Sequence, residues 1–304
     1  MIYKSVEELI GKTPMVELTN IEKKLGLKSR LVAKLEAFNP ASSAKDRVAK
    51  QIILNAEREG KLKKGGTIIE ATSGNTGIAI AMLGAARGYK VVIVMPDSMS
   101  SERQKAISAY GAEIVLTPGC EGMNGAVKKA GEIAAERENS FLAEQFENPS
   151  NPEAHFLTTG PEIYESTEGS VDAFVCTIGT GGTLSGTSRY LKSKKSSIKV
   201  YGVEPSASPL ISKGIAGTHK IQGIGANFIP ATYDKDACDE IITVSDEDAY
   251  EYTRMLSREE GLLMGISSGA ALCAAIEVAK KEENKTIVVL LSDTGLRYFS
   301  TDLF

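Results

Sequence analysis

Two segments rich in glycine and hydroxyl groups follow apolar, strand-like runs, and each could bind an anion. Residues 179–183 read Gly-Thr-Gly-Gly-Thr, and residues 72–77 read Thr-Ser-Gly-Asn-Thr-Gly. Glycines let backbone N–H groups approach an oxyanion, and the N-terminus of a following helix adds partial positive charge. The hydroxyls and the amide of residues 72–77 suit a carboxylate held by several donors. Each segment could equally be a tight or capped turn without a ligand.

Nucleotide-binding alternatives for residues 179–183 lack parts of their motifs. Glu204 lies about 20 residues downstream, where a dinucleotide site places its ribose-binding acid. However, a G-x-G-x-x-G pattern that starts at Gly179 needs a third glycine at position 184, which is Leu184. A P-loop would need Gly-Lys followed by Ser or Thr, and the segment has no such sequence.

Lys45 is a candidate nucleophile because of its predicted place at the start of a helix. Ser43 and Asp46 predict a capped helix start, and the apolar residues that follow give this helix a buried face. The helix dipole disfavours an ammonium in the first turn, so the neutral amine that Schiff-base chemistry requires is favoured there. A solvated surface lysine is the plainer alternative. Ser267 and Ser268 are both suitable N-caps for a helix predicted over 270–281, and Ser267 could instead bond a ring nitrogen.

The elements that must position these residues alternate between strands and helices almost from end to end. This order is typical of α/β proteins in which helices cover parallel sheets. Each glycine-rich loop lies in a predicted strand–helix–strand unit. The units cover 67–71, 78–87 and 90–95, and then 172–178, 184–194 and 199–203. The sequence Asn-Pro-Ser-Asn-Pro at 148–152 interrupts the pattern and predicts a domain boundary near it.

Length and composition exclude several classes of protein. The 304 residues, of which 42% are hydrophobic, predict two globular domains of about 150 residues each. The net charge of -4 comes without any run of five or more like charges, so no nucleic-acid or membrane partner is expected. No apolar stretch is long enough to span a bilayer, and Lys4, Glu7 and Glu8 interrupt the start of the chain where a secretory core would be apolar. A cytoplasmic protein is expected.

The cysteines and histidines indicate neither a metal site nor a disulfide framework. The four cysteines are widely spaced, so they are expected to be buried small hydrophobes in a reducing compartment; they are Cys120, Cys176, Cys238 and Cys273. With two histidines, a zinc site or a Ser-His-Asp triad has few residues to draw on. No metal is expected, and the catalytic base is predicted to be a residue other than histidine.

Taken together, the motifs resemble those of cysteine synthases, the O-acetylserine sulfhydrylases, over essentially the full chain. They occur in the family's order at residues 34–40, 43–47, 72–77, 95–96, 144–152, 179–183, 220–225 and 265–270. The resemblance implies a fold-type II enzyme that uses pyridoxal 5'-phosphate (PLP), with two doubly wound parallel-sheet domains and PLP in the cleft between them. The smaller, substrate-binding domain would cover 41–145, and the larger, PLP-binding domain would combine 1–40 with 146–304.

The resemblance also implies a role for each matching residue. Lys45 would hold PLP covalently, Asn75 would face its 3'-oxygen, and Ser267 would bond the pyridine nitrogen. The phosphate would be bound by Gly179, Thr180, Gly181, Gly182 and Thr183. The substrate carboxylate would be bound by Thr72, Ser73, Asn75, Thr76 and Gln145.

The implied reaction is formation of L-cysteine and acetate from O-acetyl-L-serine and sulfide, through an aminoacrylate intermediate. Asn227 departs from the glycine expected there and adds a polar group near the second substrate, so it is a candidate substrate-binding residue. Ala44, where the family has Val, is a small packing change, and Leu296 stands where the family usually has Glu.

Several alternatives remain open at the level of the sequence. A sibling PLP lyase would act on L-cysteine, releasing sulfide and forming serine or lanthionine, or on serine plus homocysteine. The family resemblance further implies a homodimer. It also implies a possible partner, the C-terminal tail of serine acetyltransferase, and the carboxylate of this tail would bind to residues 72–77. A purely regulatory protein would bind that tail without turnover, and bound nicotinamide would instead favour a dehydrogenase.

Overall fold

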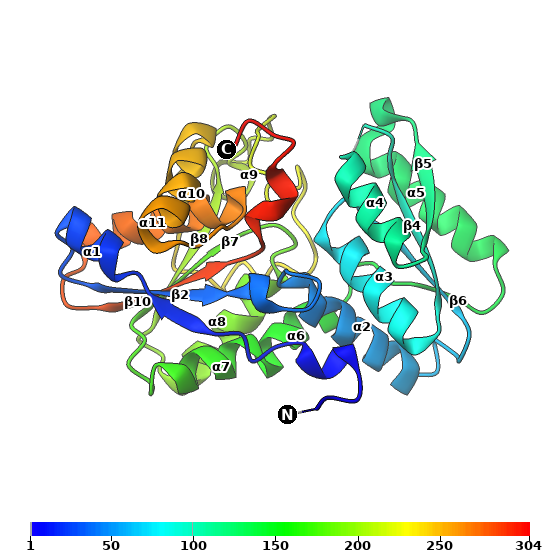
Figure 1. The fold of residues 1–304 in the computed structure, drawn as a ribbon, viewed down its shortest axis with the longest axis horizontal. Coiled ribbons are helices and arrows are strands. Elements are labelled where there is room, and N and C mark those ends of the chain that lie inside the picture. Colours follow the sequence, from blue (N-terminus) through cyan, green and yellow to red (C-terminus); the bar gives the residue numbers. More distant parts are fainter. Residues whose placement is uncertain (1, 99) are drawn as a thin grey trace.

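The computed structural model describes residues 2–98 and 100–304 of the chain. They form two mainly parallel β-sheets that lie side by side, with helices α2 (Lys45–Arg58) and α6 (Ser150–Leu157) between them (Figure 1). Helices pack on both faces of each sheet. The α/β class expected from the alternating pattern is therefore confirmed.

The six-stranded sheet has the order β1-β2-β10-β7-β8-β9. All of its described neighbours are parallel except the pair β1 and β2. In sheet order the strands are Met15–Glu17, Arg30–Leu35, Thr286–Leu291, Ala173–Thr177, Lys199–Pro205 and Glu240–Val244. Strands from the two ends of the chain thus meet at β2 and β10, where Val32 is opposite Val288.

The four-stranded sheet has the order β5-β4-β3-β6, and its described pairs are all parallel. Its strands are Glu113–Thr117, Lys90–Pro96, Thr67–Ala71 and Ser140–Leu142. The sheet is therefore built from one continuous stretch of chain, within the range predicted for the smaller domain. The predicted boundaries at 40/41 and 145/146 stay a prediction.

The remaining helices cover these sheets. Apart from α2 and α6, they are α1 (Thr19–Leu25), α3 (Asn75–Arg87), α4 (Ser101–Ala109), α5 (Gly122–Glu136), α7 (Thr159–Ser166), α8 (Gly182–Lys194), α9 (Leu210–Lys213), α10 (Asp246–Glu260) and α11 (Ile266–Lys281). Short 3-10 helices η1–η4 cover Val6–Leu9, Glu36–Phe38, Gly119–Glu121 and Gly295–Tyr298. No helix of the described chain is long and apolar enough to cross a membrane.

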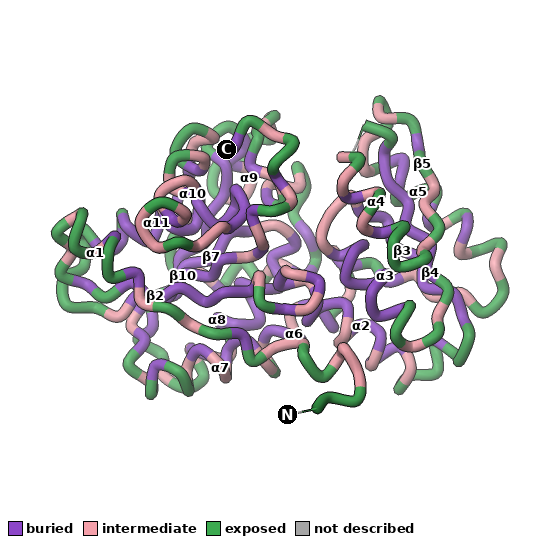
Figure 2. Tube along the Cα trace, viewed as in Figure 1, coloured by how far each residue is buried: buried purple, intermediate pink, exposed green. Residues whose placement is uncertain are grey.

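Burial on both faces explains why the central strands are almost continuously apolar. Every residue of β3 and β7 is buried, as expected for parallel strands covered by helices on two sides. Each sheet with its covering helices forms one lobe of the molecule, and Figure 2 shows the buried segments concentrated in the interior of each lobe. The core of the four-stranded sheet includes Ile68, Ile80 and Ile93, and that of the other includes Val175, Leu272 and Val289.

The helices after the glycine-rich loops begin earlier than the sequence pattern predicts. The structure starts α3 at Asn75 and α8 at Gly182, so the last loop residues already belong to the first helical turn. Helix α11 begins at Ile266, and Gly265 is its N-cap. The expectation that Ser267 or Ser268 caps this helix is therefore wrong, because both lie inside its first turn.

The four cysteines are free, and they differ in burial. Cys176 is buried, and Cys238 and Cys273 are partly buried. Cys120 is exposed because it lies in the short surface helix η3. The expectation that the cysteines are buried hydrophobes is thus wrong for Cys120.

Candidate active site

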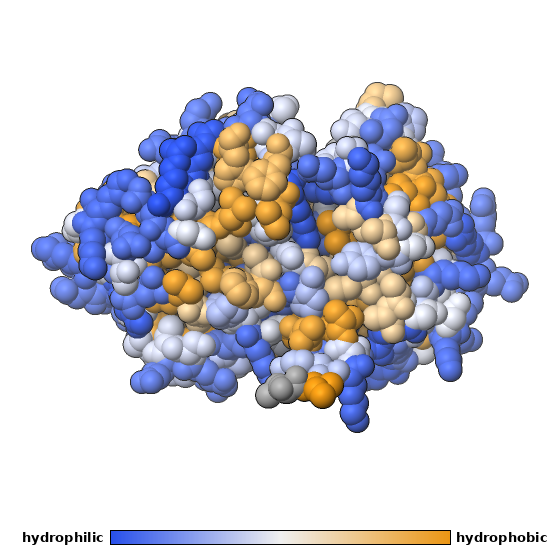
Figure 3. All heavy atoms as spheres, in the orientation of Figure 1, coloured by the Kyte–Doolittle hydropathy of each residue, from blue (hydrophilic) through white to orange (hydrophobic). Residues whose placement is uncertain are grey.

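The two glycine-rich loops follow β3 and β7, at the carboxyl ends of strands in different sheets, and both face one cavity. Its volume is about 310 Å³. Figure 3 shows a notch between the two lobes on one face of the molecule. The predicted site residues that line the cavity are Lys45, Thr72, Ser73, Asn75, Thr76, Gln145, Gly179, Thr180, Gly181, Thr183 and Ser267. Crevices at the carboxyl ends of parallel strands are the usual ligand sites of α/β folds.

Lys45 is the first residue of α2, as the sequence predicts. The helix start is held by its neighbours: Ser43 Oγ accepts from the Lys45 N–H at 3.3 Å, and Asp46 Oδ2 accepts from the Ala41 N–H at 2.6 Å. Burial lowers the pKa of Lys45, and the charge of Asp293 opposes this only in part. The described residues provide no hydrogen bond to the Lys45 amine. Burial therefore makes the neutral amine easier to reach at the cavity wall than for a lysine in water.

The glycines of the loop before α8 pack too closely against neighbouring residues to carry side chains. A Cβ on Gly179 would lie 2.4 Å from the Gly223 carbonyl oxygen, and one on Gly182 would lie 2.0 Å from Asn151 Oδ1. Gly181 has φ +79°, and its Cβ would lie 2.5 Å from Tyr233 Cβ. Glycine is therefore required at each position, and N–H groups at the start of α8 remain close to the cavity. Gly182 does not itself line the cavity.

Side chains from α6 and α7 support this loop. Asn151 Nδ2 donates to Thr180 Oγ1 at 2.9 Å, and His155 Nε2 lies 3.1 Å from Thr183 Oγ1. The other ring nitrogen of His155 lies 2.8 Å from Thr159 Oγ1. Burial lowers the pKa of His155 to about 3, so the ring is neutral. The sequence reasoning used residues 148–152 as a boundary signal and missed Asn151 and His155 as supports.

The loop before α3 is closed by Gln145 from the segment after β6. Thr76 Oγ1 donates to Gln145 Oε1 at 2.5 Å, and the Gly74 N–H donates to Thr72 Oγ1 at 3.2 Å. Thr72, Thr76 and Gln145 are buried, whereas Ser73 is partly exposed. The loop therefore presents hydroxyl, amide and N–H donors at a positive helix end, which suits a carboxylate.

Asn75 connects this loop to the C-terminal segment across the cavity. Its Nδ2 donates to Asp293 Oδ2 at 2.8 Å, and its Oδ1 accepts from Arg297 Nη1. The Tyr298 hydroxyl donates to the same Asp293 oxygen at 2.8 Å. Sequence reasoning missed Asp293 and Tyr298, although Asp293 lies two residues after the end of β10, where α/β sites collect polar residues.

Ser267 and Asn227 differ in burial and in their position relative to the cavity. Ser267 is buried, lines the cavity and has no hydrogen-bond partner for its hydroxyl among the described residues. Asn227 is exposed and lies outside the cavity lining, with its Oδ1 accepting from Ser208 Oγ at 2.8 Å. It has φ +60°, which glycine and asparagine tolerate best. This backbone position explains why asparagine can replace the expected glycine, and a substrate contact of Asn227 stays a prediction.

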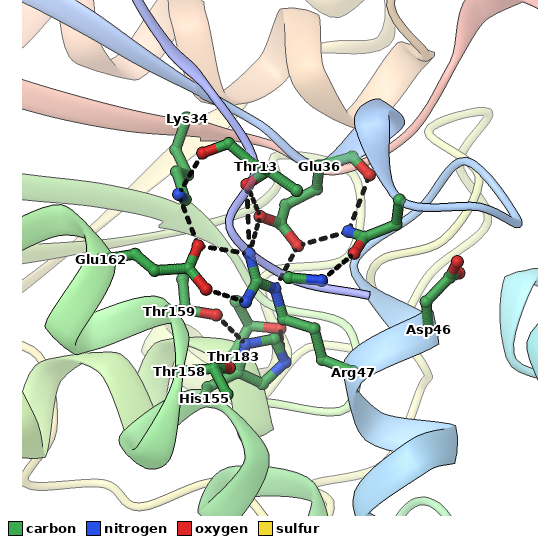
Figure 4. A network of polar contacts seen from close by, with 12 residues as sticks. Thr13, Lys34, Glu36, Asp46, Arg47, His155, Thr158, Thr159, Glu162 and Thr183 are labelled. Carbon is green, nitrogen blue, oxygen red and sulfur yellow. Dashed lines mark hydrogen bonds and ion pairs between the residues drawn. The ribbon is translucent and has the colours of Figure 1, made fainter. Parts of the chain in front are cut away.

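A buried charge network surrounds Arg47 near the start of α2 (Figure 4). Arg47 forms paired hydrogen bonds with Glu36, at 2.7 and 2.8 Å, and with Glu162, at 2.6 and 2.8 Å. Lys34 Nζ donates to Glu162 at 2.7 Å, and Thr13 Oγ1 donates to Glu36 at 2.7 Å. Burial alone would raise the pKa of Glu36, but Arg47 lowers it to about 2. The network fixes η2, α2 and α7 against one another.

The comparisons with known proteins agree with this architecture. The family model for pyridoxal-phosphate dependent enzymes matches residues 6–293, so the chain belongs to that family. A cysteine synthase of Staphylococcus aureus (strain Mu50 / ATCC 700699) is 50% identical over 302 residues, which cover 99% of this chain and 96% of that protein.

Two solved structures are similar over almost the whole chain. A cysteine synthase (OASS) from Entamoeba histolytica has 45% identity and a TM-score of 0.97, with 100% of this chain and 91% of that chain covered. A hydrogen sulfide-producing enzyme from Fusobacterium nucleatum has 46% identity and a TM-score of 0.94, with 98% and 100% covered. The fold-type II architecture implied by the sequence motifs is thereby confirmed.

Proposed function

We propose that this protein is a PLP-dependent cysteine synthase, which forms L-cysteine and acetate from O-acetyl-L-serine and sulfide. The observation that carries the proposal is the convergence of a lysine with a lowered pKa and the N-termini of two helices on one cavity. PLP brings one anion, its phosphate, and the amino-acid substrate brings another, its carboxylate. Two helix N-termini beside Lys45 can hold these two anions close to the same amine.

The residues present fit PLP. In the loop at residues 179–183, a Cβ on any of the three glycines would collide with neighbouring residues, and the N–H groups at the start of α8 are available to a phosphate. In the proposal, Lys45 holds the cofactor's carbonyl carbon and Ser267 supplies the unpaired hydroxyl for the ring nitrogen. A neutral hydroxyl stabilises an unprotonated ring better than a carboxylate would, which suits elimination and replacement at Cβ.

The substrate carboxylate is assigned to the loop at residues 72–77 together with Gln145. Thr72, Ser73 and Thr76 provide hydroxyls, and the first turn of α3 provides N–H groups. Asn75 is assigned to the cofactor's 3'-oxygen and to this carboxylate, so it would exchange at least one of its contacts with Asp293 and Arg297.

When bound, PLP supplies delocalisation of the negative charge that forms at the substrate Cα. The chain's own part is to place the amine of Lys45 beside that carbon, where it takes up the Cα proton. Residues 72–77 orient the substrate by its carboxylate. The bond between Cβ and the acetate oxygen breaks and acetate leaves. Bisulfide then bonds to Cβ, and the amine returns a proton to Cα.

The proposal is tested by turnover of the PLP-loaded protein. O-acetylserine and sulfide should give cysteine and acetate in equal amounts, measured by chromatography and by proton NMR. A protein that binds PLP but releases no acetate from O-acetylserine would contradict it. The same test excludes a purely regulatory protein.

A second candidate is a sibling reaction that consumes cysteine. It is favoured by the similarity to the enzyme from Fusobacterium nucleatum, which is described as hydrogen sulfide-producing. A substrate panel with cysteine alone and with cysteine plus a second thiol would reveal it through sulfide release. Serine plus homocysteine tests the other sibling reaction, which would form cystathionine and water without releasing sulfide. Rates above that of cysteine formation would replace the first candidate.

We further propose a cytoplasmic homodimer that can bind the C-terminal tail of serine acetyltransferase. The tail's carboxylate would use the donors of residues 72–77, as the substrate does. Light scattering tests the dimer, and competition between the tail peptide and O-acetylserine tests the shared site.

A further inference from the structure

Arg103 is a buried cation in the cavity wall that the proposed reaction does not use. It lies in α4, it lines the cavity, and only 8% of its surface is exposed. Within residues 2–98 and 100–304 it has no hydrogen-bond or ion-pair partner, and its Nε is fully buried without one. Leaving a buried charge unpaired costs several kcal/mol. The position therefore suits an anion that arrives from outside the chain.

The aromatic neighbour of Arg103 does not replace such an anion. The guanidinium carbon lies 5.8 Å from the centre of the Tyr298 ring, near the long limit for a cation–π contact. The Tyr298 hydroxyl donates to Asp293, and Asp293 also accepts from Asn75. No ion pair between Arg103 and Asp293 occurs in the described structure, so this carboxylate does not neutralise the guanidinium.

Helix α4 places Arg103 next to the loop at residues 72–77 but outside it. Ile107 lies one helical turn after Arg103, on the same face of α4. Its Cδ1 would lie 3.2 Å from a Cβ on Gly77, so this face packs directly against the start of α3. The donors of residues 72–77 are assigned to the first carboxylate. Arg103 extends the same wall of the cavity with a separate positive group.

We propose that Arg103 anchors a second carboxylate subsite in this cavity. The inference rests on the proposed function, because that reaction releases acetate, and an amino-acid thiol would bring a carboxylate of its own. A guanidinium presents two parallel N–H groups that match a carboxylate, and it remains charged when buried. The leaving acetate and the carboxylate of an incoming nucleophile are two sources of the same ligand chemistry.

Acetate inhibition of the PLP-loaded enzyme tests the subsite. Arg103→Met should raise the inhibition constant of acetate about tenfold or more, and Arg103→Lys should raise it less because the charge remains. Arg189→Met is the matched control, since Arg189 is exposed and stacks on Phe156 at 4.8 Å, away from the cavity. Saturation-transfer NMR of acetate on the same proteins measures binding without turnover.

Two thiols distinguish the sources of the carboxylate. If the subsite serves the nucleophile, Arg103→Met should raise the KM of thioglycolate but not that of 2-mercaptoethanol. If it serves acetate, the variant should lower kcat/KM for O-acetylserine with bisulfide, and the ratio between the two thiols should not change. If the wild type does not use thioglycolate, acetate is the remaining source and the acetate titration decides alone.

Unchanged acetate binding together with an unchanged thiol ratio in Arg103→Met would overturn the inference. So would an equal loss in every assay accompanied by a lowered melting temperature, because that result indicates a structural role. A wild-type enzyme that fails to form cysteine would instead contradict the proposed function. The acetate NMR measurement still tests Arg103 in that case.

Discussion

Lys45 combines three properties that a covalent PLP lysine needs: it begins a helix, it lines the cavity, and its pKa is lowered by burial. We predict that reduction of the loaded protein with borohydride, followed by peptide mapping, finds the pyridoxyl group on Lys45. Lys45→Ala should lose turnover and retain PLP only non-covalently. Lys50, in the same helix, donates to the Glu7 carbonyl oxygen, and Lys50→Ala is the control. A pyridoxyl group on another lysine would refute the assignment.

The two loops should separate cofactor binding from substrate binding. Gly182→Ala places a Cβ 2.0 Å from Asn151 Oδ1 and should reduce PLP retention after dialysis. Gln145→Leu should retain PLP but raise the KM of O-acetylserine about tenfold, as expected for losing one hydrogen bond to a charged group. Gly131→Ala is the control, since its Cβ meets nothing within 4 Å. Equal loss of PLP in the two test variants would contradict this division.

At the scale of the elements, the network around Arg47 joins α2 to η2 and α7. Removing the cation leaves Glu36 charged and fully buried, so Arg47→Met should lower the free energy of unfolding by about 3–5 kcal/mol. Adding Glu36→Gln to this variant should restore part of the loss. Chemical denaturation measures both, and a loss below about 1 kcal/mol in the single variant would show that the network is not needed for stability.

The ion pair between Arg47 and Glu36 also makes the free energy of unfolding depend on pH. The pKa of Glu36 is about 2 in the folded protein, below the ordinary value of 4.5, so its contribution is complete above about pH 4.5. That contribution, on the order of 3 kcal/mol, is lost as the pH falls towards 2. Glu36→Gln should therefore flatten the acid side of the stability profile. An unchanged slope between pH 2 and 4.5 would contradict the prediction.

At the scale of the whole molecule, the C-terminal segment connects the two lobes across the cavity. Arg297 donates to Asn75 Oδ1 and to the Ala41 carbonyl oxygen, and Ser300 donates to Glu102 in α4 at 3.0 Å. Arg297→Met should increase amide hydrogen exchange in residues 295–304 and at the start of α3, while the central strands stay protected. Mass spectrometry measures this exchange.

The control for that experiment is Arg137→Met, which removes an exposed ion pair with Glu113 at 2.9 Å. It should leave the exchange of the C-terminal segment unchanged. If Arg297→Met has the same exchange pattern as the wild type, the segment is held by packing rather than by these polar contacts.

The sequence by itself determined the features that depend on local patterns. Apolar runs gave the strand Thr67–Ala71 with its observed bounds, and the Ser43–Asp46 pattern placed Lys45 at a helix start, because capping acts over a few residues. The glycines of residues 179–183 indicated a close approach to the backbone, and the structure shows which neighbouring atoms lie there. The order of these motifs was also sufficient to indicate the family.

Only the tertiary structure decided which distant groups meet. Asn75 and Asp293 are 218 residues apart in the chain, and Arg47 and Glu162 are 115 apart. Such pairings depend on how strands cross over within each sheet, which local spacing does not encode. Likewise, only the structure shows that Asn227 accepts a hydrogen bond from Ser208 and that Ser267 lies inside a helical turn. It also shows that Arg103 is buried in the cavity wall. Each of these outcomes follows from packing between elements, because burial and unpaired polar groups are properties of the assembled fold.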